Sequence, residues 1–278
     1  MNKIAIIPNT SKDPELKVTK ELVSLISGRA SLVLPVDFEG RIQDVQFVED
    51  VYKEADVAIV IGGDGTIIKS ALPCAKAQIP ILGINLGRVG FMSEVERGSI
   101  SSAVDCLMNN DYMVEQRMMM DVEIIFKSGQ RQKFHALNDA VIEKARGVNL
   151  IGIELYSDKE KINQYVADGI IISTPTGSTG YNLSAGGPVV NPLMNLFIAT
   201  AICPHMLTAR PAVLPADKSL EICAGCGLLG NAVASVDGEI VASLEPGDKI
   251  VISKSHYHIK LIKTIRRSFY DTLIDKLL

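Results

Sequence analysis

The chain has 278 residues, of which 47% are hydrophobic and 22% are charged, so it can form one large or two ordinary domains with a sizeable core. Its formal net charge of −4 does not favour nonspecific binding to nucleic acid. No apolar run reaches membrane-spanning length and no signal-peptide pattern is present, so we expect a cytoplasmic protein that binds neither nucleic acid nor membrane.

The first 110 residues alternate strand and helix patterns, which is typical of βαβ units and a mostly parallel sheet. In chain order we expect a strand at 3–8, a helix at 13–27, a strand at 31–35, a helix at 43–55, a strand at 56–61, a helix at 66–77, a strand at 80–85 and a helix at 99–110. The sequence therefore predicts a Rossmann-like α/β domain over residues 1–110.

The segment Gly62-Gly63-Asp64-Gly65-Thr66 lies between the buried strand at 56–61 and the helix after it. Open α/β sheets bind ligands at the carboxyl ends of their strands, and glycines there let backbone N–H groups approach phosphate. A carboxylate repels phosphate, so Asp64 is better suited to accept a hydroxyl proton or to hold a metal. The combination indicates phosphoryl transfer. A tight turn in which Asp64 caps the helix is the alternative.

A second glycine-rich segment, from Asn85 to Phe91, follows the strand at 80–85. Its glycines would bring the backbone close to a ligand. Alone, this pattern indicates a loop as readily as a site.

Strand patterns dominate after residue 111, with turn residues between them. We expect strands at 119–126, 133–143, 152–156, 161–173, 219–224, 232–236, 249–253 and 257–262. They predict a β-rich domain over residues 111–264, built as a layered antiparallel sheet or sandwich. An amphipathic helix at 268–278 ends the chain, and we expect residues 265–278 to pack back on the first domain.

Three polar segments interrupt these strand patterns. The segment 174–187 is dense in hydroxyls and glycines, which suit ribose and phosphate oxygens, and its Tyr181 could stack on a base. Asp168 lies within an apolar strand pattern and needs a partner such as a ligand amine, a ribose hydroxyl or an arginine. Asn138 suits an adenine edge. Turns, for the first segment, and a strand edge or bulge, for Asn138, are the alternatives.

Five cysteines, mostly in apolar contexts, predict free thiols rather than a disulfide framework. Cys223 and Cys226 have CxxC spacing, and Cys203 and His205 lie upstream of them. A zinc site is therefore an alternative for these four residues.

In this order, the motifs resemble those of the NAD kinase family. The resembling segments are Gly62–Thr66, Asn85–Phe91, Asn138-Asp139, Asp168-Gly169, Thr174–Tyr181, Ser184–Pro188, Cys203–His205 and Asp237-Gly238. Asp139 replaces the usual Glu, and Gly180 replaces the usual Ala. Lipid kinases share the Gly-Gly-Asp-Gly-Thr loop, so a lipid or other small-molecule kinase and a non-catalytic dinucleotide-binding regulator are the alternatives.

The resemblance implies transfer of a phosphoryl group from ATP, or in some members from polyphosphate, to the 2′-hydroxyl of the adenosine ribose of NAD. It implies that Asp64 is the general base and that Mg²⁺ neutralises the phosphates. Phosphate would meet Gly62, Gly63, Gly65 and Thr66. NAD would meet Asp64, Gly65, Phe91, Asn138, Asp139, Asp168, Thr179, Tyr181 and Ser184. The site would lie between the two domains of a homodimer or homotetramer.

Overall fold

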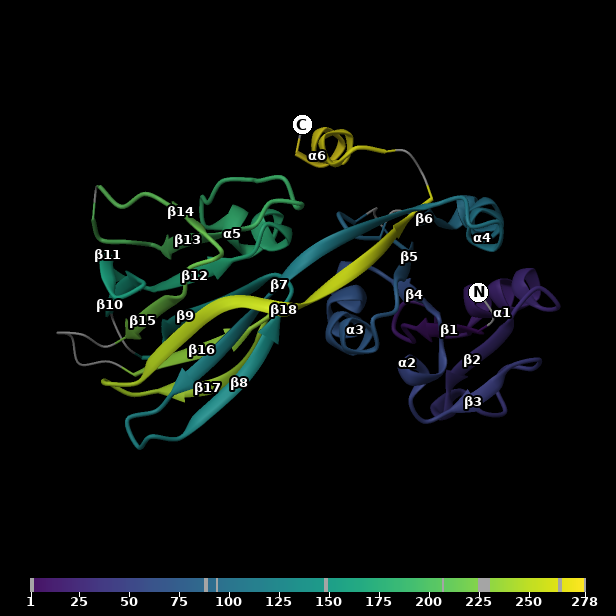
Figure 1. The fold of residues 1–278 in the computed structure, drawn as a ribbon, viewed down its shortest axis with the longest axis horizontal. Coiled ribbons are helices and arrows are strands. Elements are labelled where there is room, and N and C mark those ends of the chain that lie inside the picture. Colours follow the sequence, from purple (N-terminus) through teal and green to yellow (C-terminus); the bar gives the residue numbers. More distant parts are fainter. Residues whose placement is uncertain are drawn as a thin grey trace. The chain divides into compact units, whose positions relative to one another are not determined.

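Figure 1 shows the computed structural model, which describes residues 3–87, 90–93, 95–147, 150–206, 208–224, 231–264 and 267–277. The chain divides into two compact units. The first comprises Met1–Gln116 and Ile259–Leu278, and the second comprises Arg117–His258. No helix among the described residues has the length and apolar character needed to cross a bilayer.

The first unit contains a parallel sheet with the strand order β3-β2-β1-β4-β5. These strands are β1 (Lys3–Pro8), β2 (Ser31–Pro35), β3 (Gln46–Val48), β4 (Val57–Gly62) and β5 (Ile81–Asn85). The short β6 (Val95–Glu96) and the end of β18 (Lys249–Lys263) also pair with β5 in parallel. The chain leaves β1 for β2 on one side and β4 for β5 on the other. The carboxyl ends of β1 and β4 therefore form the switch point at which such sheets bind ligands.

Helices cover both faces of this sheet because its side chains alternate in direction. Helices α1 (Lys17–Ile26) and α4 (Ile100–Met108) pack on one face, against alternate residues such as Ile4 and Ile6. The short α2 (Val51–Glu54) packs on the other face, against Ala5 and Val33, and α3 (Asp64–Ala77) lies beside it. The last helix of the chain is α6 (Phe269–Leu277).

One predicted helix of this unit is wrong. Residues 43–55 form β3 and the single-turn α2 instead of one helix. Phe47 and Val48 favour a strand and pack against the cores on the two sheet faces. Asp44 has a positive φ of 61°, and the Asp50 side chain accepts hydrogen bonds from the Tyr52 and Lys53 amides, so helix begins only after Asp50.

The second unit consists of two antiparallel sheets that share one hydrophobic core. One sheet has the order β14-β13-β12-β9-β16-β17, and the other contains β11-β10-β15-β18 with β7 and β8. The bounds are β7 (Met113–Ile125), β8 (Arg131–Ala136), β9 (Asp139–Lys144), β10 (Ile151–Ser157), β11 (Glu160–Ala167), β12 (Gly169–Ser173), β13 (Leu196–Ile202), β14 (Ala212–Pro215), β15 (Leu220–Ala224), β16 (Ala232–Val236) and β17 (Glu239–Leu244). The predicted fold class, α/β followed by layered antiparallel sheets, is confirmed.

Several strand boundaries differ from the prediction. The predicted strands at 133–143 and 161–173 are each divided in two, at Asn138 and at Asp168, and those at 249–253 and 257–262 form the single β18. Strands β13, β14 and β17 were not predicted. The apolar run of β13 does not alternate, and periodicity alone does not separate such a run from a buried helix.

Candidate active site

Asp64 is the first residue of α3, directly after β4 and the N-capping Gly63. Its Oδ2 accepts a hydrogen bond from the Phe91 amide at 2.8 Å. Its Oδ1 accepts hydrogen bonds from the amides of Met92 and Ser93, at 3.2 and 3.1 Å, and from the Ser93 hydroxyl at 3.0 Å. The segment Phe91–Ser93 thus orients the carboxylate. Among the described residues Oδ2 has one donor and Oδ1 has three, so Oδ2 keeps more capacity to accept a proton.

The glycine-rich segment after β5 is shaped around this carboxylate. A Cβ atom on Gly90 would lie 1.8 Å from Asp64 Oδ1, so only glycine fits there. The Asn85 side chain organises the same segment, because its Oδ1 accepts the Gly87 amide at 2.8 Å and its Nδ2 donates to Ser93 Oγ at 3.1 Å. The pattern that was weak in the sequence therefore builds the support of Asp64.

A cavity of about 530 Å³ lies at the switch point, lined by residues Ile7–Lys12, Tyr52, Gly63, Gly65, Thr66, Lys69 and Ser70. The Lys12 ammonium lies 2.7 Å from where a Cβ on Gly63 would stand, so its charge is held against the glycine loop. Lys12 and Lys69 form no ion pair with another described residue, and both charges face the cavity. Gly65 has open space around its Cα. This cavity can hold an anion.

The Thr66 hydroxyl has a structural task at this cavity. It accepts hydrogen bonds from Asn9 Nδ2 at 2.8 Å and from the Gly63 amide at 3.5 Å. It also lies where a Cβ on Gly62 would stand, at 2.2 Å. Thr66 therefore ties the β1 loop to the start of α3, and its own hydroxyl hydrogen is left to donate.

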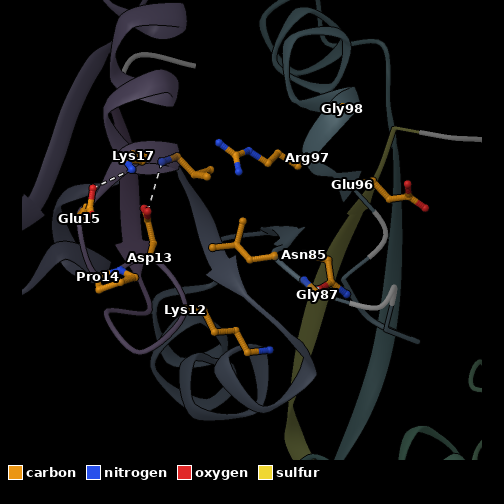
Figure 2. A pocket seen from close by; sticks show the side chains of 12 residues that line it. Lys12, Asp13, Pro14, Glu15, Lys17, Asn85, Gly87, Glu96, Arg97 and Gly98 are labelled. Atoms are coloured by element: carbon orange, nitrogen blue, oxygen red, sulfur yellow. Dashed lines mark hydrogen bonds and ion pairs between the residues drawn. The ribbon is translucent and has the colours of Figure 1, made fainter.

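A second hollow, of about 440 Å³, lies on the other side of Lys12. Figure 2 shows the Arg97 side chain reaching toward Lys17 across this hollow, while Lys12 points away from both. Lys17 is paired with Glu15 at 2.7 Å. The buried Asp13 caps α1, since it accepts the Thr19 amide and hydroxyl at 2.9 and 2.7 Å. These carboxylates are committed to local structure.

In the second unit, Asp237 holds the break between β8 and β9. Its Oδ2 accepts the Leu137 amide at 2.8 Å, and its Oδ1 accepts the amides of Asn138 and Asp139 at 2.7 and 3.2 Å. The Asp139 carboxyl is buried beside it. Burial first, and the negative charge of Asp237 second, raise the pKa of Asp139 to about 7. Burial also raises the pKa of Asp237, against the lowering effect of its three amide donors.

A pocket of about 460 Å³ opens over these residues, lined by Asn138, Asp139, Val141, Glu143, Tyr181, Ser235, Asp237 and Gly238. The Asn138 side-chain oxygen is buried and has no hydrogen-bond partner among the described residues. Tyr181 is 43% exposed, and burial, followed by the charge of Glu143, raises its pKa. A ligand that presents an N–H or O–H group to Asn138 would satisfy the orphaned oxygen.

The hydroxyl-rich segment after β12 spends many of its polar groups inside the protein. Thr174 donates its hydroxyl to Leu137 O at 2.6 Å, and its amide donates to Asn138 O at 2.8 Å. Asn182 Nδ2 donates to the Ser178 and Pro188 carbonyls at 3.1 Å each. The segment contains the single-turn α5 (Tyr181–Ser184), so the turn interpretation holds for part of it. Two other candidates lie at its surface: Thr179 is half-buried and Ser184 is exposed.

Asp168 lies between β11 and β12 and not inside a strand. Its carboxylate pairs with Lys144 Nζ at 2.8 Å, a partner that was not among those expected from the sequence. Gly169 and Ser173 stand at opposite ends of β12, and Ser173 pairs with Asp139, so Asp168 lies near the far end of that strand. Its charge still contributes to the raised pKa of Tyr181.

The zinc alternative gains no support. Cys226 lies outside the described residues, Cys203 is exposed, and Cys223 is a half-buried free thiol. The described part of the chain holds no group of three histidine, cysteine or acidic side chains able to bind a metal.

The structure groups the candidates within each unit. Asp64 lies with Phe91 in the first unit, next to the glycine loop, and Asn138 and Asp139 lie with Tyr181 in the second. Sequence reasoning missed Asn9, Lys12 and Ser93, and noted Asp237 only as part of a motif. The signal for Lys12 was its place: Asn9–Lys12 follows β1 as the glycine loop follows β4, and carboxyl ends of parallel neighbours meet at one edge.

Two family models match the chain. Residues 4–112 match the ATP-NAD kinase N-terminal domain, and residues 137–264 match the ATP-NAD kinase C-terminal domain. An NAD kinase of Lachnoclostridium phytofermentans is 38% identical over 285 aligned residues, with 99% of each chain covered. An NAD kinase of Ruminiclostridium cellulolyticum is 35% identical over 282 residues, with 100% of this chain and 98% of the relative covered.

Two solved structures share the fold. A crystal structure of yeast NADH kinase complexed with NADH has a TM-score of 0.87 at 23% identity, covering 100% of this chain and 87% of the other. A crystal structure of an NAD kinase from Archaeoglobus fulgidus in complex with ATP has a TM-score of 0.75 at 24% identity, covering 99% and 98%. At these identities the likeness supports the fold.

Proposed function

Because the chain belongs to the NAD kinase family and so phosphorylates NAD to NADP, we propose that Asp64 is the general base of this phosphotransferase. The observation that carries this assignment is the orientation of its carboxylate by Phe91–Ser93, which leaves Oδ2 the less occupied oxygen. Oδ2 would accept the proton of the adenosine 2′-hydroxyl as that oxygen attacks phosphorus. A carboxylate is a weak base for an alcohol, so fixed orientation must supply much of its effect.

The donor phosphates would bind in the cavity at the switch point. Gly62, Gly63 and Gly65 admit the phosphate oxygens to backbone N–H groups at the start of α3, where the helix dipole also favours an anion. Thr66 donates its remaining hydroxyl hydrogen. Lys12 and Lys69 add two positive charges that the sequence motif does not include.

The proposed cofactor is Mg²⁺, and these residues fit an ion that arrives on the donor phosphates. Magnesium commonly binds through phosphate oxygens, water and one or two carboxylates. The described residues offer no preformed cage, and both oxygens of Asp64 already accept hydrogen bonds. Bound Mg²⁺ would neutralise charge on the transferring phosphoryl group.

The pocket over Asn138 would bind the adenosine part of NAD. The orphaned oxygen of Asn138 would accept the adenine amino group, and Asp139 would bind a ribose hydroxyl. Tyr181 and Phe91 offer ring faces to the bases. Gly65, Asp168, Thr179 and Ser184 complete the proposed contacts, with Asp168 acting while paired with Lys144.

Assembly and location follow the family expectation: we propose a homodimer or homotetramer that works in the cytoplasm. Light scattering of the purified protein over a range of concentrations tests the assembly. A monomer at working concentration that retains full activity contradicts it.

A coupled assay tests the activity directly. The purified protein is incubated with NAD, Mg²⁺ and either ATP or polyphosphate, and NADP is detected with an NADP-specific dehydrogenase. We expect NADP from NAD and ATP, and none without Mg²⁺. NAD binding without NADP formation would favour the dinucleotide-binding regulator, and phosphorylation of a lipid in place of NAD would favour the lipid kinase.

A further inference from the structure

Helix α6 is an amphipathic helix that leaves large apolar side chains in solvent. Tyr270 is 56% exposed and Ile274 is 54% exposed. Its first turn is capped locally, because Asp271 Oδ2 accepts the Ser268 hydroxyl at 2.7 Å, and Arg267 pairs with Asp275. A helix that buries so little of itself is easily displaced.

The Phe91 ring is the contact point of α6 within the first unit. The Phe269 ring lies 6.0 Å from the Phe91 ring, with an angle of 43° between their planes. The Lys276 ammonium lies 4.5 Å from the centre of the Phe91 ring, in a cation–π contact. Residues i and i+7 recur on one helix face, so a single face of α6 presents both groups to Phe91.

Phe91 also belongs to the support of the proposed base. Its amide is the donor to Asp64 Oδ2, at 2.8 Å, and its ring is one of the aromatic faces that the proposed function assigns to NAD. The ring surface that α6 covers with Phe269 and Lys276 is therefore the surface that a base would need for stacking.

We propose that α6 is a displaceable cover of Phe91, which competes with a base of NAD and so sets the affinity for the acceptor. The cover rests on the proposed function, since it uses the role of Phe91 in NAD binding. Phe269 and Lys276 act through Phe91 and are positioning residues. When α6 leaves, the Phe91 ring is free to stack, and its amide continues to hold Asp64.

The test compares F269A and K276Q with I274A, whose side chain is exposed on α6 and makes no ring contact with Phe91. We expect F269A and K276Q to lower the KM for NAD about threefold to tenfold, with kcat and the KM for ATP unchanged. I274A keeps wild-type values. Calorimetric titration with NAD alone gives the matching change in Kd. K276Q removes only a surface ammonium, so it serves as the test if F269A fails to fold.

A double-mutant cycle with F91A decides whether the effect passes through Phe91. In the F91A background, K276Q should no longer change the Kd for NAD. An unchanged or raised KM for NAD in both variants, or an effect of K276Q that persists without the Phe91 ring, overturns the cover. Absence of NADP formation in the wild type would instead overturn the proposed function, and the NAD titrations separate the two failures.

Discussion

Asp64 in the first unit and Asp237 in the second are anchored in the same way, yet they serve different surroundings. Each carboxylate accepts hydrogen bonds from three consecutive backbone amides, Phe91–Ser93 for Asp64 and Leu137–Asp139 for Asp237. Asp64 begins a helix of 14 residues, whose dipole favours negative charge. Asp237 sits in a hairpin turn with a φ of 48°, beside the buried Asp139.

The difference shows that three amide donors orient a carboxylate without deciding its task. At the helix end a single negative charge is stabilised and held toward a cavity edge, which suits a base. In the hairpin two carboxyls share a buried corner, and the cost of a second charge appears as the raised pKa of Asp139. Asp237 is then a support, and its neighbour is the group that changes charge near pH 7.

Removing the charge of Asp64 should have the largest effect. D64N keeps the size of the side chain but removes the proton acceptor, so we expect kcat to fall by about 10²- to 10⁴-fold. The Kd for NAD should change little. Steady-state kinetics and calorimetry measure the two quantities. Turnover that survives in D64N would move the role of base to another residue.

Displacing the Asp64 carboxylate without removing it comes second. In G90A the new Cβ would lie 1.8 Å from Asp64 Oδ1, so the carboxylate must move. A misplacement of this size should lower kcat by about 10²-fold. G87A is the control in the same segment, because its nearest neighbour, Asn85 Oδ1, lies at an ordinary 3.7 Å. Equal losses in G90A and G87A would show that anchoring by this loop is unimportant.

Disturbing the anchor in the second unit should act on stability and on NAD binding. D237N turns one acceptor oxygen toward the amides into a donor, which we expect to cost about 1–3 kcal/mol of the free energy of unfolding. The KM for NAD should rise because Asn138 and Asp139 lose their support. D158N is the control: Asp158 has a similar positive φ of 47° but is exposed and accepts only from Ser219. Thermal melts that match between D237N and D158N would contradict the anchoring role.

The smallest expected effect is a pH dependence from Asp139. Its pKa is raised from 3.8 to about 7 in the folded chain. Between these values the native state keeps a proton that the unfolded chain has released, so this group's contribution to stability falls as pH rises through that window. D139N stays neutral at all pH values. We expect its Tm to exceed that of the wild type at pH 8 and the difference to shrink toward pH 4. Parallel Tm curves would show that Asp139 does not titrate there.

Local sequence patterns determined much of this protein. Alternating strand and helix periodicity gave the α/β half, period-two strands gave the layered β half, and the glycines around Asp64 marked a strand end where ligands bind. The resemblance to NAD kinases added the identity of the substrates. These features are readable because each depends on residues that are neighbours in the chain, and the predicted helix at 43–55 was wrong where a few strand formers opposed the helical pattern.

Only the tertiary structure decided which groups hold the proposed catalytic and binding residues. Asp64 is oriented by amides 27 to 29 residues away, and Asn138 by a carboxylate 99 residues away. Lys12 meets Gly63 because β1 and β4 are adjacent in the sheet. The raised pKa of Asp139 likewise needs burial and a partner from a distant hairpin. Hydrogen bonds and desolvation depend on which segments meet in space, and no periodicity within a segment encodes that.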